Sequence, residues 1–230
     1  MRAAWRALAA AIAAIVNWRY FKPAVFILCA LPLVLIGYEF AQVVTGRNPE
    51  ALGADPSKAL LEELGEKGIT LLLATLTVTP IRRLFNVNRI QRVRRMLGVW
   101  SFTYIAIHLG AYLVFDQLCY SAATCDFDAI WQDVLKRPYI FMGTVGFVIL
   151  LALAITSTQG WTRRLKKNWA RLHSLVYVAA LAGIIHFIWI QKSGVARPLP
   201  WIVWLAVVLG IRLYYAARKR LAPSRSAVTA

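Results

Sequence analysis

The residues most able to carry chemistry in this chain are its three histidines, His108, His173 and His186. Each lies inside a long apolar stretch, where an imidazole without a partner costs free energy. A neutral imidazole is a common ligand for metals and for the iron of haem. The alternative for any single histidine is a structural one, in which a carbonyl on a neighbouring helix satisfies the ring. Three such histidines together favour metal or haem ligation.

The apolar stretches predict a membrane protein. Hydrophobic residues make up 60% of the 230 residues, and the mean hydropathy is +0.58, which is high for a soluble domain. Each stretch is near the length of about 20 residues that crosses the hydrocarbon core of a bilayer. We therefore predict an all-α fold, a polytopic bundle of six transmembrane helices. The expected spans are 23–44, 68–81 continued through Pro80 to Phe85, 96–118, 139–158, 172–190 and 199–217.

The positive charge is distributed as in a membrane protein and not as in a nucleic-acid-binding one. Of the 27 Lys and Arg residues, 20 fall in one alternating set of the segments between spans, and this set contains no acidic residue. The other set holds the remaining seven basic residues and all ten acidic ones. By the positive-inside rule, the basic set faces the cytoplasm, so both termini are expected there. The basic set consists of 1–22, 82–95, 160–171 and the tail from Arg212.

The resulting organisation is a cytoplasmic N-terminal segment at 1–22, one membrane domain at 23–217 and a cytoplasmic tail at 218–230. The N-terminal segment is expected to stay uncleaved at the inner surface, and an interfacial amphipathic helix is an alternative description of it. The outer loop at about 45–67 alternates leucines with glutamates. This pattern predicts a short amphipathic helix that lies on the outer membrane surface.

The cysteines indicate a disulfide bond on the outer side. Cys119 and Cys125 lie close together in the outer loop 116–138, in a compartment that is oxidising if the protein is in a bacterial inner membrane. A disulfide is favoured there, and two free thiols or a metal pair are the alternatives. Cys29 lies within the first predicted span and is expected to serve packing.

Depth in the membrane decides which histidines can act together. A haem held by two histidines needs both imidazoles at one depth, on different helices. His108, on the third span, lies eight residues before Asp116, and His186, on the fifth, lies six before Lys192. Since both spans run outward, these two match in the outer half of the bilayer. His173 lies thirteen residues before His186, roughly 20 Å deeper, where a second haem, a propionate, another cofactor, a quinone or only water could be its partner.

Three segments of the chain resemble a known family. They are LTVTPIRR at 76–83, RRMLGVWSFTYIAIH at 94–108 and WARLHSLVYVAALAGIIH at 169–186. Together they are similar to the haem-binding membrane subunits of bacterial periplasmic methionine-sulfoxide reductase systems (MsrQ type), within the ferric-reductase-like transmembrane family. The combination of motifs is specific, and the resemblance covers nearly the whole chain. By motif position, His108, His173 and His186 match the three histidines of this family.

The resemblance implies a b-type haem and a flavin mononucleotide in a multi-pass protein of the bacterial inner membrane. It implies electrons taken from the quinone pool and passed to a periplasmic molybdenum-dependent reductase that repairs methionine sulfoxide in envelope proteins. Two-haem relatives carry four histidines, whereas Gly98 or a neighbour takes the inner position on the third span here. This favours one haem with His108 and His186 as axial ligands and His173 as a further candidate. The chain would have no substrate-reducing site of its own.

Two other functions remain open. One is a self-contained membrane reductase of ferric or cupric ions, which shares the haem but needs no protein partner. The other is a transporter or proton channel with titrating histidines, and the absence of any acidic residue in the middle of a span speaks against it. The sequence has no G-x-G-x-x-G and no Walker motif, so it offers no dinucleotide or triphosphate site of these types. A nucleic-acid partner is not expected.

Overall fold

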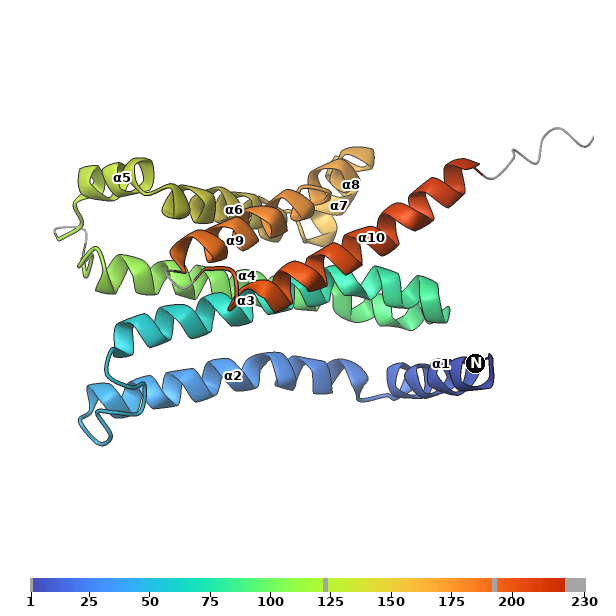
Figure 1. Ribbon diagram of the computed structural model, residues 1–230, viewed down its shortest axis with the longest axis horizontal. Helices are drawn as coiled ribbons and strands as arrows, with labels where there is room; N and C mark the ends of the chain where they lie inside the picture. Colours follow the sequence, from blue (N-terminus) through green and yellow to red (C-terminus); the bar gives the residue numbers. More distant parts are fainter. Residues whose placement is uncertain (1, 122–123, 192–193, 222–230) are drawn as a thin grey trace, which may run out of the picture.

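The computed structural model describes residues 2–121, 124–191 and 194–221, and the regular structure within these ranges is helical (Figure 1). The elements are α1 (Arg2–Asn17), α2 (Phe21–Val44), α3 (Pro56–Phe85), η1 (Asn88–Ile90), α4 (Gln91–Phe115), α5 (Phe127–Lys136), α6 (Pro138–Ile155), α7 (Gln159–Leu165), α8 (Lys167–His173), α9 (Val176–Ile190) and α10 (Leu199–Leu221). Within the described residues, six helical segments are long and apolar enough to cross a membrane. This confirms the predicted all-α fold and its six spans. The chain is a multi-pass membrane protein.

Four long helices form the centre of the bundle. Helix α3 packs along α4, and α6 packs along α9. Helix α4 also contacts α6, and α3 contacts α9, so the four helices form a ring in which α4 and α9 are diagonally opposite. Helix α2 packs against α4 and α3, and α10 packs against α3 (Figure 1). The diagonal position of α4 and α9 matters because each carries one histidine of the matched pair.

Helix α3 departs from the prediction at its outer end. The residues expected to form a separate helix on the membrane surface are the first part of α3, which continues without a break for 30 residues. Asp55 starts it by accepting a hydrogen bond from the Lys58 N–H at 3.0 Å. The prediction of a separate surface helix is wrong because Leu60 and Leu64 are buried in a cluster with Tyr104 of α4, which holds this segment upright in the bundle.

One arginine bridges two glutamates of the same segment. Arg197, which precedes α10, binds Glu62 and Glu66 of α3 at 2.6 Å each. Its hydrogen bond to the Glu62 carboxylate raises the pKa of the Arg197 guanidinium further above its ordinary value. The pair of contacts ties the connection between α9 and α10 to the outer end of α3.

Pro80 creates a special requirement inside α3. Proline lacks the N–H that the carbonyl of residue 76 would accept in a regular helix, and within a membrane such a carbonyl needs another donor. Arg212 of α10 is that donor, since its Nη2 binds the Leu76 carbonyl at 2.5 Å. Its Nη1 donates to the Tyr177 hydroxyl of α9. One guanidinium therefore joins α3, α9 and α10.

Two tryptophans strengthen the contact between α10 and α3. The indole N–H of Trp201 donates to the Thr70 hydroxyl, and that of Trp204 donates to the Thr77 hydroxyl, each at 2.9 Å. Between helices in a bilayer, polar contacts of this kind add to packing because lipid offers no competing partner.

The N-terminal segment forms the helix that one of the sequence-based descriptions expected. In α1, Val16 is buried and Trp5 stacks on Phe85 of α3, with ring centroids 4.7 Å apart. Leu8 and Ile15 are exposed. The helix therefore has one side against the bundle and an apolar side free, as an interfacial helix requires.

The first helix and the end of the last helix that the structure describes lie on the same side of the bundle. Helix α1 and the end of α10 are at the same end in Figure 1, as an even number of spans requires. That this end faces the cytoplasm stays a prediction from charge. Of the expected tail 218–230, residues 218–221 continue α10, and residues 222–230 lie outside the described part of the chain.

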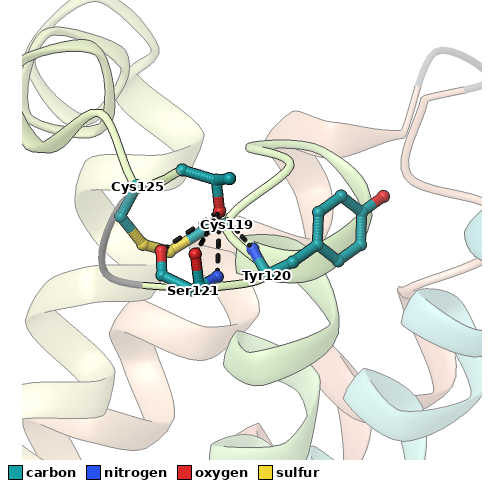
Figure 2. The surroundings of a disulfide bond; sticks show 5 residues. Cys119, Tyr120, Ser121 and Cys125 are labelled. Atoms are coloured by element: carbon teal, nitrogen blue, oxygen red, sulfur yellow. Dashed lines mark hydrogen bonds between the residues drawn. A yellow bond between two sulfur atoms is a disulfide. The ribbon is translucent and has the colours of Figure 1, made fainter.

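The loop between α4 and α5 contains the expected disulfide. Cys119 and Cys125 are bonded to each other, which confirms the favoured alternative (Figure 2). The Thr124 hydroxyl closes the same loop by accepting hydrogen bonds from the backbone N–H of Tyr120 and of the next residue. Cys29 is buried in the core, as the sequence predicts for a packing residue.

The link between Pro80 and Arg212 can be tested with a double-mutant cycle. We expect Arg212→Met to lower the free energy of unfolding by about 2 kcal/mol, because a buried carbonyl loses its charged donor. In a Pro80→Ala background, the backbone N–H of the introduced alanine can serve the Leu76 carbonyl, and the loss should shrink by about half. Thermal unfolding in detergent measures both. Equal losses in the two backgrounds would show that Arg212 does not act through this carbonyl.

Candidate functional site

His108 of α4 and His186 of α9 meet inside the ring of helices. Their imidazole centroids are 6.2 Å apart, and the two ring planes are nearly perpendicular at 86°. The structure thus brings together the two histidines that were predicted, from their matching depth in the membrane, to act as a pair. Lys192, the residue used to gauge the depth of His186, lies outside the described residues.

Each imidazole of this pair is held by a backbone carbonyl on the adjacent helix. His108 Nδ1 lies 2.9 Å from the Leu61 carbonyl oxygen of α3, and His186 Nδ1 lies 2.6 Å from the Tyr139 carbonyl oxygen of α6. A carbonyl can only accept a hydrogen bond, so in both rings Nδ1 carries the proton and donates it. The other nitrogen, Nε2, then keeps a lone pair.

A glycine makes room for each imidazole. A Cβ added to Gly65 would lie 3.3 Å from the His108 ring, and a Cβ added to Gly143 would lie 2.9 Å from His186 Nδ1. Each glycine stands four residues after the carbonyl that holds the same histidine, which is one helical turn. The histidine rings therefore rest against the bare backbone of α3 and α6.

The two half-sites repeat one another in sequence. In both, the histidine follows the residue with the accepting carbonyl by 47 positions. Leu61, Gly65 and His108 correspond to Tyr139, Gly143 and His186 at a constant shift of 78 residues. The glycines and carbonyls are not among the residues predicted from sequence, although this repeat at a shift of 78 residues is a signal that points to them.

These positions fit a metal held between the two rings. Metal–imidazole bonds of about 2 Å on opposite sides of one ion place the ring centroids roughly 6 Å apart, close to the 6.2 Å observed. The alternative to ligation is a histidine whose ring is satisfied by a carbonyl on a neighbouring helix. The structure shows such a carbonyl at each ring, but it engages only Nδ1, and in metal sites the second nitrogen of a ligating histidine has such a partner as a rule.

His173 lies apart from the pair, at the end of α8. Its ring stacks on Trp169, with centroids 3.9 Å apart, and its Nδ1 lies 3.2 Å from the Trp169 carbonyl oxygen. Its Nε2 is buried, and no hydrogen-bond partner for it occurs among the described residues. Arg171 and Lys167 on the same short helix are exposed. The structure therefore does not bring His173 to the other two histidines.

Two tyrosines near the histidines serve helix packing. Tyr104 is fully buried and donates to the Cys29 carbonyl of α2 at 2.7 Å. Tyr177 accepts its hydrogen bond from Arg212. Both hydroxyls thus have protein partners.

A polar cluster joins the outer side of the site to α5. Asp133 of α5 accepts a hydrogen bond from the Tyr112 hydroxyl at 2.5 Å and pairs with Arg137 at 2.7 Å. Arg137 also donates to the Tyr139 hydroxyl at 3.4 Å, and this bond raises the pKa of Arg137 further above its ordinary value. Because the Tyr139 carbonyl holds His186, helix α5 is connected to the histidine pair through two residues, Arg137 and Tyr139.

A six-span bundle with two histidines paired inside it defines a class of integral membrane protein, and comparison with known proteins places this chain within it. The family described as ferric reductase like transmembrane component matches residues 64–184, which contain His108 and His173 and end two residues before His186. The chain belongs to the ferric-reductase-like transmembrane family, in its MsrQ group.

Three relatives named "Protein-methionine-sulfoxide reductase heme-binding subunit MsrQ" illustrate the similarity. The one from Xanthomonas euvesicatoria is 43% identical over 183 residues, which cover 80% of this chain and 81% of the relative. The one from Xanthomonas campestris is 40% identical over 205 residues, 89% of each chain. The one from Rhodospirillum rubrum is 41% identical over 203 residues, 88% of this chain and 91% of the relative.

Proposed function

We propose that this chain is a membrane electron-transfer subunit that holds one b-type haem between His108 and His186 and works with a methionine-sulfoxide reductase. The observation that carries the proposal is the pair of imidazoles 6.2 Å apart, each with Nδ1 held by a carbonyl. The relatives' names, which describe haem-binding subunits of this reductase, support it. Bound haem supplies one-electron redox chemistry.

The protein's own residues orient the two ligands and set their electronic character. The Leu61 and Tyr139 carbonyls fix the tautomer in which Nε2 is free, and hydrogen bonding at Nδ1 makes Nε2 a stronger donor to iron. Gly65 and Gly143 fix the position of each ring against the helix backbone. The ring of four helices keeps the site within an apolar environment, which disfavours access of water.

The direction of electron transfer follows from the proposed topology. We place the basic end of the bundle in the cytoplasm and the outer end, with the disulfide and α5, in the periplasm of a bacterial inner membrane. The quinone pool as electron source and a molybdenum-dependent reductase as acceptor are the partners that the family resemblance implies. The connection from α5 through Tyr139 to His186 supports acceptor docking on the outer side.

A flavin mononucleotide is proposed as the second cofactor, near His173. The support is the buried Nε2 of His173, which has no hydrogen-bond partner within the described part of the chain, beside the exposed cations Lys167 and Arg171. Cations of this kind suit the flavin phosphate. In this arrangement the flavin near His173 lies in the inner half of the membrane, and the haem at the histidine pair lies in the outer half.

The haem ligands can be tested by single substitutions. We expect His108→Ala and His186→Ala each to abolish the low-spin haem spectrum of the purified protein, because one imidazole cannot supply both axial bonds. His173→Ala should keep a low-spin spectrum, since its ring stacks on Trp169 roughly 20 Å along the chain from His186. Absorption spectra at equal protein concentration measure all three. An unchanged spectrum in both the His108→Ala and the His186→Ala variant would contradict the assignment of these two histidines as haem ligands.

The glycines allow a test that leaves the ligands in place. We expect Gly143→Ala to lower haem affinity by about tenfold, as changes to ligand-orienting contacts do, because its Cβ would meet His186 Nδ1 at 2.9 Å. Gly65→Ala should have a smaller effect, since its Cβ would lie 3.3 Å from His108. Haem titration of each variant measures this. Gly110→Ala, with no atom within 4 Å of its Cβ, is the control, and equal affinity of all three variants would contradict the assigned role.

The flavin proposal predicts flavin in the purified protein. Replacing Lys167 and Arg171 by glutamine should lower the flavin recovered by about fivefold, because charge-assisted contacts to the phosphate are lost. Acid extraction followed by fluorescence measures the amount per protein. The matched control changes Arg218 and Lys219, which are exposed on α10. Equal flavin loss in both double variants, or none in either, would place the flavin elsewhere.

A further inference from the structure

A groove on the periphery of the bundle lies between α2 and α4, away from the histidine pair. Its volume is about 530 Å³. At its basic end it is lined by Lys22, Arg92 and Arg95. Farther along, the lining is apolar and consists of Phe26, Met96, Val99 and Trp100. The groove is therefore amphiphilic along its length.

The order of these residues follows the membrane normal. On α4, Arg92 and Arg95 stand at the inner end and Val99 and Trp100 follow one to two turns deeper, with Thr103 at the far end of the groove. From Arg92 to Thr103 the helix rises roughly 16 Å. A ligand that fits this order has its charged group at the inner membrane surface and an apolar chain that extends toward the middle of the bilayer.

The charged end of the groove calls for an anion. Lys22, Arg92 and Arg95 are exposed, and within the described residues none of them forms a salt bridge. The inner segments of the sequence contain no acidic residue that could approach them. The counter-charge must therefore come from another molecule.

Part of this cationic end is held in place before any ligand binds. Arg92 donates from Nη2 to the Val16 carbonyl of α1 at 3.0 Å and from Nε to the Arg89 carbonyl at 3.2 Å, which leaves Nη1 available. The apolar part is also ordered, because Phe26 and Trp100 contact edge to face with centroids 5.2 Å apart. A site ordered in this way loses less conformational entropy on binding.

We propose that this groove binds one anionic phospholipid of the inner leaflet. The phosphate lies among Lys22, Arg92 and Arg95, and one acyl chain lies along Phe26 and Val99. The cationic end and the apolar part of the groove together select an anionic phospholipid. A soluble phosphate compound has no chain for the apolar part, and a quinone has a chain but no negative charge for the three cations. The lipid joins α2 to α4 and, through Arg92, to α1.

Native mass spectrometry of the purified full-length protein tests the proposal. Dioleoyl phosphatidylglycerol and dioleoyl phosphatidylcholine are offered at equal concentration, and we expect one phosphatidylglycerol to be retained in preference. Replacing Lys22, Arg92 and Arg95 by glutamine should reduce this retention by about tenfold or more. Val99→Trp, which fills the apolar part at an exposed position, should reduce it while the haem spectrum stays unchanged.

A matched control separates the groove from the general positive charge of the surface. Replacing Arg163, Arg164 and Lys219 by glutamine removes the same number and type of charges from exposed sites outside the groove, and it should leave retention unchanged. The proposal is overturned if both lipids are retained equally, if the control triple variant loses as much lipid as the groove triple variant, or if glycerol phosphate, flavin mononucleotide or ubiquinone displaces the bound lipid. These outcomes do not depend on whether haem binds at the histidine pair.

Discussion

The structure depends on one constraint, which is that a polar group within the hydrocarbon needs a partner that lipid cannot supply. The histidine pair obeys it through two backbone carbonyls, Leu61 and Tyr139, which engage Nδ1 and leave Nε2 for another ligand. The same constraint explains Arg212, whose guanidinium serves the carbonyl that Pro80 leaves without a donor. In both cases a hydrogen bond to a backbone carbonyl fixes the position of a polar side chain.

The site is built twice from the same parts, and this gives it its symmetry. One half pairs α3 with α4 and the other pairs α6 with α9, and each half supplies a carbonyl, a glycine one turn later and a histidine. The four helices close into a ring, so the two histidines approach from opposite corners. Two imidazoles held in this way could ligate the iron of one haem between them, whereas a transported ion or proton would not require matched imidazoles.

The two ends of the bundle differ in chemistry, in keeping with a directional function. The end with α1 and the last turn of α10 carries most of the Lys and Arg residues, and the amphiphilic groove between α2 and α4 lies there. The other end carries the acidic residues, the disulfide and α5, which reaches the histidine pair through Arg137 and Tyr139. The proposed lipid site and the proposed docking side for a protein partner therefore lie on separate surfaces.

The sequence by itself determined the six spans, their all-α class and the depth at which His108 and His186 match, because bilayer thickness and the rise of a helix fix these from residue counts alone. It also indicated the disulfide. Its prediction was wrong for the outer part of α3, where burial of Leu64 against α4 overrides an amphipathic pattern. Which carbonyls hold the imidazoles, which glycines admit them and which donor serves Leu76 were decided only by the tertiary structure. These contacts join residues 43 to 136 positions apart, and no local periodicity determines which helices become neighbours.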